Sequence, residues 1–146
     1  MIYLAGDNHG FQAIQFVKQY LAKHAIPFQD LGVQQPSEDM PLEVLIPPVV
    51  KNVIKNQENK AILSCGTGVG VEVGANKFSG IRASLATNPK VAEYSIVYDN
   101  CNVLCLVGWG CTQDSVYEIL DAWLNVTYDG DEKRLKMMAT FDTWRD

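Results

Sequence analysis

A cysteine followed by alternating glycines, Cys65-Gly66-Thr67-Gly68-Val69-Gly70, is the segment of this chain best suited to chemistry. It follows an apolar run, so we expect it at the end of a buried strand. Alternate glycines let the backbone approach a ligand closely, with several N–H groups pointing the same way. Such amides favour the thiolate of a neighbouring cysteine, which can act as a nucleophile or general base, and they can stabilise an oxyanion. The alternative interpretation is a small, buried, unreactive cysteine.

The spacing of these glycines argues against a nucleotide site. The pattern is G-x-G-x-G with a further glycine at position 74, whereas dinucleotide-binding folds use G-x-G-x-x-G. No acidic residue follows about 20 positions later to hold a ribose, and no Gly-Lys-Ser/Thr marks a P-loop. Binding of a dinucleotide or a nucleoside triphosphate is therefore disfavoured.

Other candidate residues each have two interpretations. His9 lies near Asp7 at the end of the first apolar run, where it is either a site residue or part of a turn. Trp109 stands between two glycines after the last apolar run, and it either lines a pocket or caps the sheet. Three cations near the C-terminus are either solvated or hold an anion: Lys133, Arg134 and Lys136.

The remaining cysteines do not indicate a metal site. Cys101, Cys105 and Cys111 have the spacing C-x3-C-x5-C, which matches no zinc signature. We predict that they pack in the core as small apolar side chains. The sequence therefore predicts no metal site.

The hydrophobic pattern indicates the scaffold that must position these residues. Short apolar runs typical of buried strands occupy residues 2–5, 26–31, 61–64, 81–86 and 102–107. Helical patterns lie between them, one carried by Ile14, Val17 and Leu21, one opened by Pro47-Pro48, and one running from Val116 to Trp123. Five alternations of strand and helix predict a three-layer α/β/α Rossmann-like domain with a five-stranded parallel sheet. Ligands bind such sheets outside the carboxyl ends of the strands.

The length and the C-terminal segment suggest one domain with an added tail. A chain of 146 residues is the size of a single domain, so we assign residues 1–146 to one unit. Residues 129–146 are charged and stand apart from the alternating pattern. Met137, Met138 and Phe141 give this tail an apolar face, which we expect to be helical and to pack on a second subunit.

Charge and composition exclude several classes of partner. The net charge is −5 with no long basic run, which disfavours nucleic acids and membrane surfaces, so an anionic ligand must be held locally. No apolar run reaches the 18 residues of a membrane span. The first residues lack the pattern of a signal peptide, so we expect a cytoplasmic protein with reduced thiols.

Three segments resemble the ribose-5-phosphate isomerase B family, which also contains the subunits of galactose-6-phosphate isomerase. The most specific segment runs from Ala61 through the Cys65 loop to Ala75-Asn76-Lys77 and Ala83. The opening Gly6-Asp7-Asn8-His9-Gly10-Phe11 and the later Tyr98-Asp99-Asn100-Cys101-Asn102-Val103-Leu104 resemble two further family motifs. Together they extend the resemblance over most of the chain.

The resemblance implies a Rossmann-like fold and cofactor-free interconversion of an aldose phosphate and a ketose phosphate. It implies that Cys65 is the base that moves a proton between C1 and C2 through an enediolate. The Thr67 hydroxyl would stabilise the enediolate oxygen together with the backbone amides of the loop, which belong to Gly66, Gly68, Val69 and Gly70. Asp7 would contact the ring oxygen or a hydroxyl of the sugar. The family forms dimers or larger assemblies, so we expect a homodimer or tetramer, with a hetero-oligomer as the alternative.

The departures from the family pattern concern the groups that hold the substrate. The ring-opening histidine of the family is Tyr98 here, and its phosphate-contacting histidine is Asn8, with His9 adjacent. The paired Asn-Asp is reversed as Asp99-Asn100, and an arginine is replaced by Trp109. The arginines that the family supplies across its dimer are only loosely replaced by Lys133, Arg134 and Lys136.

These departures lead us to expect a changed substrate. Ring opening would fall to His9 or Asp99, whereas an open-chain sugar such as a tetrose phosphate would need no ring-opening acid and would explain Tyr98. The competing hypothesis is a non-catalytic sugar-phosphate binder, or the partner subunit of a hetero-oligomeric isomerase.

Overall fold

The predicted α/β fold with a five-stranded parallel sheet is confirmed. The computed structural model describes residues 1–144, so Arg145 and Asp146 of the predicted tail lie outside the described residues. The sheet has the order β2-β1-β3-β5-β4, and all its strands are parallel. The strands are β1 (Ile2–Gly6), β2 (Phe28–Asp30), β3 (Lys60–Cys65), β4 (Ala83–Leu85) and β5 (Val103–Val107). Each coincides with one of the five predicted apolar runs.

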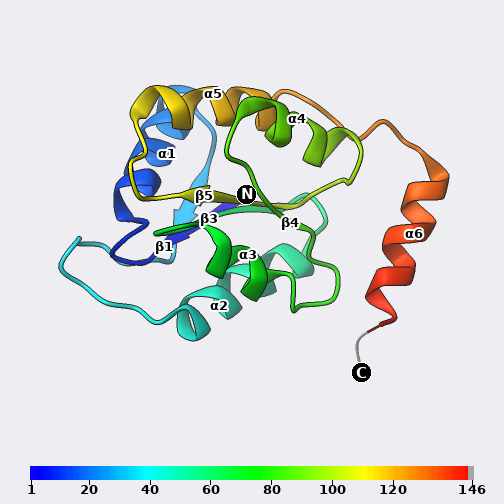
Figure 1. Ribbon diagram of the computed structural model, residues 1–146, viewed down its shortest axis with the longest axis horizontal. Helices are drawn as coiled ribbons and strands as arrows, with labels where there is room; N and C mark the ends of the chain where they lie inside the picture. The colour runs from blue at the N-terminus through cyan, green and yellow to red at the C-terminus, as the bar shows by residue number, and fades with distance from the viewer. Residues whose placement is uncertain (145–146) are drawn as a thin grey trace.

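The helices cover both faces of the sheet, as the three-layer prediction requires. Figure 1 shows α1 (Phe11–Lys23), α4 (Pro89–Val97) and α5 (Gln113–Leu124) on one face. The other face carries α2 (Leu42–Lys55) and α3 (Val69–Ala75). The buried side chains form two clusters, one under each helical layer. Burial of β1, β3 and β5 on both sides explains why their sequences are continuous apolar runs.

The predicted start of the second helix is wrong. This helix, α2, begins at Leu42 after Pro41, so that Pro47 and Pro48 lie inside it rather than at its first turn. Prolines inside a helix remove backbone donors, which usually favours a helix end. Here the apolar face of α2 outweighs that cost, because it buries five side chains: Leu45, Ile46, Val49, Val50 and Val53.

The predicted C-terminal helix is also present, and it stands beside the layers. Figure 1 shows α6 (Glu132–Asp142) at the side of the sheet, away from β1. The carboxylate of Asp142 accepts a hydrogen bond of 2.8 Å from the amide of Gly80, and Met138 is buried. In contrast, Leu135, Met137 and Phe141 are exposed. The helix therefore contacts its own chain with part of its surface and leaves other apolar residues exposed.

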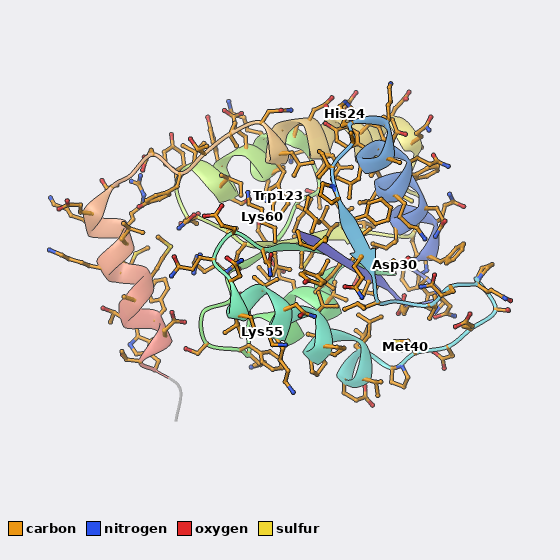
Figure 2. The ribbon with its side chains drawn as sticks, turned by 180° about the vertical axis from the view of Figure 1, so that it is seen from behind. His24, Asp30, Met40, Lys55, Lys60 and Trp123 are labelled. Atoms are coloured by element: carbon orange, nitrogen blue, oxygen red, sulfur yellow. The ribbon has the colours of Figure 1, made fainter. Side chains whose placement is uncertain are left out.

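Two side chains, those of Lys60 and Trp123, pack against each other at the amino end of β3. Figure 2 shows Lys60 and Trp123 close together, and the ammonium of Lys60 lies 4.8 Å from the centroid of the buried indole. Burial lowers the pKa of Lys60. The opposite end of β3 leads directly into the Cys65 loop.

A buried tyrosine connects α1 to α5 and gives a stability prediction. The phenol of Tyr20 donates a 2.5 Å hydrogen bond to Asp121, and desolvation together with this bond raises the pKa of Tyr20 to about 12. The folded protein therefore keeps this proton in a pH range where the unfolded chain loses it, so stability falls as pH rises from about 10 to 12. We expect Tyr20→Phe to cost about 1 kcal/mol at neutral pH.

Urea denaturation at neutral pH and at several alkaline pH values tests this prediction. The gap in unfolding free energy between wild type and Tyr20→Phe should shrink as pH rises through this range. A gap that stays constant up to about pH 12 would show that Tyr20 does not titrate in this way.

Candidate active site

The carboxyl ends of β1, β3 and β5 bring several predicted site residues together. Gly6 pairs with Ser64, and Cys65 pairs with Val107, so these three strands end at the same edge. The amide of Asp7 donates to Ser64, and the amide of Gly108 donates to the carbonyl of Cys65. The segments carrying Asp7, Asn8, His9, Cys65–Gly70 and Trp109 therefore lie side by side, as the strand-end rule predicts.

The thiol of Cys65 lies beside the start of α3. Cys65 is 6% exposed, and a Cβ placed on Gly70 would lie 3.8 Å from its sulfur. Gly70 belongs to the first turn of α3, where a helix leaves N–H groups without intrahelical acceptors. A nearly buried thiol next to such groups is suited to proton transfer and to stabilising an adjacent oxyanion.

The loop between Cys65 and α3 depends on a left-handed residue at Gly68. Its φ is +78°, and a Cβ there would approach Leu85 and the backbone of Leu106. The next amide, that of Val69, donates to the hydroxyl oxygen of Thr67 at 3.2 Å. In this bond the Thr67 oxygen is the acceptor, so the hydroxyl proton of the exposed Thr67 side chain remains available to donate to a ligand.

Asp7 holds the first loop in place. One of its carboxylate oxygens accepts the amides of His9 at 3.0 Å and Gly10 at 2.8 Å. Asn8 is half-buried between these residues. The other carboxylate oxygen of Asp7 remains suited to accept a hydrogen bond from a substrate hydroxyl.

His9 and Trp109 form a pair across the carboxyl edge. The indole N–H of Trp109 donates to Nδ1 of His9 at 3.3 Å, and the two rings meet edge to face. The Trp109 ring also lies against Gly66, where a Cβ would come within 2.5 Å of a ring carbon. Trp109 therefore lies against the Cys65 loop, although it is 59% exposed.

A second group of predicted residues lies at the opposite, amino edge of the sheet. Tyr98, Asp99 and Asn100 come between α4 and the start of β5. The Nε of Arg134 donates to the carbonyl of Tyr98 at 2.8 Å, and its guanidinium lies over the Tyr98 ring. Asp99 also lines a cavity of about 690 Å³ between α6 and the rest of the chain.

The two groups do not meet within one chain. Val103 pairs with Ala61 at the amino edge, whereas Val107 pairs with Cys65 at the carboxyl edge. Four residues of strand separate these pairs, which corresponds to about 13 Å. A single copy therefore holds Cys65 apart from Tyr98, Asp99, Asn100 and the cations of α6.

Comparison with known proteins identifies the family of this chain. The family model for Ribose/Galactose Isomerase matches residues 2–139. The chain belongs to the ribose/galactose isomerase family. It is 32% identical over 131 residues to a probable ribose-5-phosphate isomerase B of Mycoplasma pneumoniae, covering 88% of this chain and 85% of that one.

Two further members of the isomerase family are informative about substrates. A 4-deoxy-4-sulfo-D-erythrose isomerase of Clostridium sp. is 31% identical, covering 74% of this chain and 68% of that one. The crystal structure of ribose-5-phosphate isomerase B from Mycoplasma genitalium with bound ribulose 5-phosphate matches with a TM-score of 0.88 and 29% identity. That match covers 98% of this chain and 94% of the other.

The cations of this isomerase's tail differ in how they are held. Arg134 forms ion pairs with Asp129 and Asp131 in addition to its bond to Tyr98. The hydrogen bond from the Asp131 amide, followed by that from Arg134, lowers the pKa of Asp129. Lys133 and Lys136 are exposed one turn apart on α6. The charge of Arg134 is thus largely balanced by its own chain, whereas the two lysines remain better placed to bind an anion.

The other cysteines of the isomerase lie in apolar surroundings, as predicted. Burial, followed by the charge of Asp99, raises the pKa of Cys101 to about 12, and burial raises the pKa of Cys105 well above its usual value. Cys111 is half-buried against the core under α5. Within residues 1–144, no three His, Cys, Asp or Glu side chains gather to form a metal site. None of the helices described in that range is long and apolar enough to cross a membrane.

Two asparagines of the isomerase have a role that the sequence analysis missed. The side chain of Asn76 both donates to and accepts from the backbone of Ala83, with each bond at 2.9 Å. Asn102 bonds in the same way to the amide of Arg82 and the carbonyl of Gly80. Both asparagines fall in the motifs that resemble the family, and they fasten the short strand β4 to its neighbours.

We expect Asn76→Ala to destabilise the isomerase by about 2 kcal/mol, because two backbone groups of Ala83 lose their partner. Urea denaturation measures this change. Asn52→Ala is the matched control, since the side chain of Asn52 makes an exposed bond to the carbonyl of Pro48. Equal losses for the two variants would contradict the role given to Asn76.

Proposed function

We propose that this sugar-phosphate isomerase interconverts an aldose phosphate and a ketose phosphate by moving one proton between C1 and C2, with Cys65 as the base. The observation that carries the proposal is the thiol of Cys65 beside the first turn of α3, at the edge where parallel sheets bind ligands. The named activities of its relatives support the same class of reaction.

The reaction needs a base beside C1 and C2 of the sugar and, next to it, an oxyanion site that faces O1. The thiolate of Cys65 takes the proton from C2 of the aldose, a C1–C2 double bond forms, and the negative charge moves to O1. The Thr67 hydroxyl and the amides of Gly66–Gly70 stabilise that charge. The proton of the O2 hydroxyl then moves to O1, the double-bond electrons take the proton of Cys65 at C1, and the ketose results.

The phosphate requires cations, and the described segments that meet beside Cys65, residues 7–9, 65–70 and 109, contain none. We propose that a second copy of the chain supplies them, with its amino edge and α6 facing the Cys65 loop. Because such an interface is two-fold, each copy completes the site of the other. Lys133 and Lys136 of the second copy would hold the phosphate, while Arg134 keeps Tyr98 in position.

Exposed apolar side chains flank both halves of this composite site. Val69 and Val73 of α3 are 48% and 53% exposed beside the Cys65 loop. Val73 also borders a groove of about 380 Å³ between α2 and α3 that includes Gly70 and Phe78. On the other half, α6 exposes Leu135, Met137 and Phe141. Burial of both surfaces in one dimer would remove apolar area from water at the same time.

Proton NMR of purified protein with four-, five- and six-carbon aldose phosphates tests the proposal. We expect one or more of them to be converted to the matching ketose phosphate. A rise in melting temperature with these sugars but no conversion would favour the non-catalytic binder instead. Loss of conversion of cyclic sugars only, on Asp99→Ala or His9→Asn, would assign ring opening to that residue.

A further inference from the structure

Helix α3 depends on the rest of the chain for its position beside Cys65. It has seven residues, and two of them, Gly70 and Gly74, are of a type that is unfavourable inside a helix. A helix this short is not stable by itself in water. Its buried side chains are the small ones of Val71 and Ala75. Contacts with neighbouring elements must therefore fix where its first turn lies.

The outer edge of β4 supplies such contacts. This strand lies at the end of the sheet, paired with β5 on one side, and α3 lies near it (Figure 1). The carboxylate of Glu72 accepts a hydrogen bond of 2.9 Å from the amide of Leu85, and Asn76 bonds twice to Ala83. Side chains of α3 thus take the place of a neighbouring strand on backbone groups that a sheet edge leaves unpaired.

Leu85 contacts the Cys65 loop as well as α3. A Cβ on Gly68 would lie 2.5 Å from Cδ1 of Leu85, so this side chain packs directly on the left-handed residue between Cys65 and α3. The amide of the same leucine is bonded to Glu72. One residue of β4 therefore connects the loop to the helix that follows it.

The half-buried Glu72 lies two residues after Gly70 in α3. A Cβ on Gly70 would lie 3.8 Å from the sulfur of Cys65, so a shift of α3 relative to β4 would change the surroundings of the thiol. A misplacement of about 1 Å in an active site can lower a rate by about 100-fold. The bond from Leu85 to Glu72 is thus in a position to affect catalysis.

We propose that Glu72 is a positioning residue, which holds the Gly66–Gly70 segment and the first turn of α3 against the Cys65 thiol through its bond to Leu85. The inference rests on the proposed function, because this segment is the one assigned to stabilise the charge on O1. Glu72 acts through Leu85 and α3, and it does not touch the reacting atoms.

Two variants of Glu72 test the inference through steady-state kinetics. Glu72→Ala and Glu72→Gln both remove the charge, but glutamine keeps a carbonyl oxygen that can accept the Leu85 amide. We expect Glu72→Ala to lower kcat by about 10- to 100-fold and to leave KM within about threefold of wild type. Glu72→Gln should retain about half of the wild-type kcat or more. Equal kcat values for the two variants would overturn the inference.

Asn76→Ala separates positioning from a general loss of stability. It removes two bonds between α3 and β4, but at Ala83, two residues before Leu85. We expect it to lower kcat by less than about threefold, although it destabilises the protein. A loss of kcat as large as that of Glu72→Ala would show that activity follows stability alone, and would overturn the inference.

Hydrogen exchange measured by mass spectrometry tests the same inference without an activity assay. The amides of residues 66–71 should exchange faster in Glu72→Ala than in Glu72→Gln, because the loop and the first turn of α3 open more often. Equal exchange in an active enzyme would overturn the inference and leave the proposed function intact. Faster exchange in a protein that converts no sugar phosphate would support the positioning by Glu72 and overturn the proposed function.

Discussion

Cys65→Ala is expected to reduce kcat by about 1,000-fold or more, with little change in the affinity for the sugar phosphate. The variant removes the group that takes and returns the proton, and general base catalysis of this kind typically contributes between about 100- and 10,000-fold. It leaves the amides of the Gly66–Gly70 segment in place. Steady-state rates on the best substrate of the panel measure the loss.

Cys111→Ser is the matched control for this experiment. Cys111 also follows a strand of the sheet, but it packs against the core beneath α5 and lies outside the proposed site. We expect this variant to retain more than about half of the wild-type kcat. Circular dichroism confirms that both variants are folded. If Cys65→Ala retains activity within about 10-fold of wild type, another group is the base.

Two inactive variants are expected to form an active mixed dimer. Cys65→Ala disables the carboxyl edge, and the double variant Lys133→Ala/Lys136→Ala disables the cations of α6. In a two-fold dimer with one copy of each, one site carries both defects and the other carries neither. Co-expression with two different affinity tags isolates this mixed dimer, and we expect about half of the wild-type activity per dimer.

Dimers of each variant alone, purified in the same way, are the controls. Each should have less than about 1% of wild-type activity, because both of its sites carry the same defect. A mixed dimer no more active than these controls would show that Cys65 and the α6 lysines of one chain serve the same site, contrary to the separation of the two edges.

The strands could be predicted from sequence because burial on both faces leaves a clear pattern. Each of the runs at 2–5, 61–64 and 102–107 is nearly free of charge, and each lies in the sheet within a residue of its predicted position. The start of α2 could not be predicted in this way. Its two internal prolines are locally unfavourable, and the burial that compensates for them depends on contacts distant in sequence.

In the candidate site too, contacts that follow from strand direction could be predicted, whereas contacts between side chains distant in sequence could not. The Cys65 loop, Asp7 and His9 were brought together as strand ends should be, because that rule depends only on strand direction. The bond between Trp109 and His9 joins residues 100 positions apart, so no spacing rule could reveal it. The ion pairs of Arg134 with Asp129 and Asp131 could not be predicted either, because the sequence shows only that a cation lies near two carboxylates.

The most direct test of the central claim is the transfer of deuterium from solvent to the substrate carbon. Wild-type protein incubated with its substrate in D2O should place deuterium at C2 of the recovered aldose or at C1 of the ketose, because the Cys65 thiol exchanges with water between steps. Mass spectrometry and NMR measure both positions. The account predicts that Cys65→Ala abolishes this incorporation while still binding the sugar. Incorporation by Cys65→Ala at the wild-type rate would contradict it.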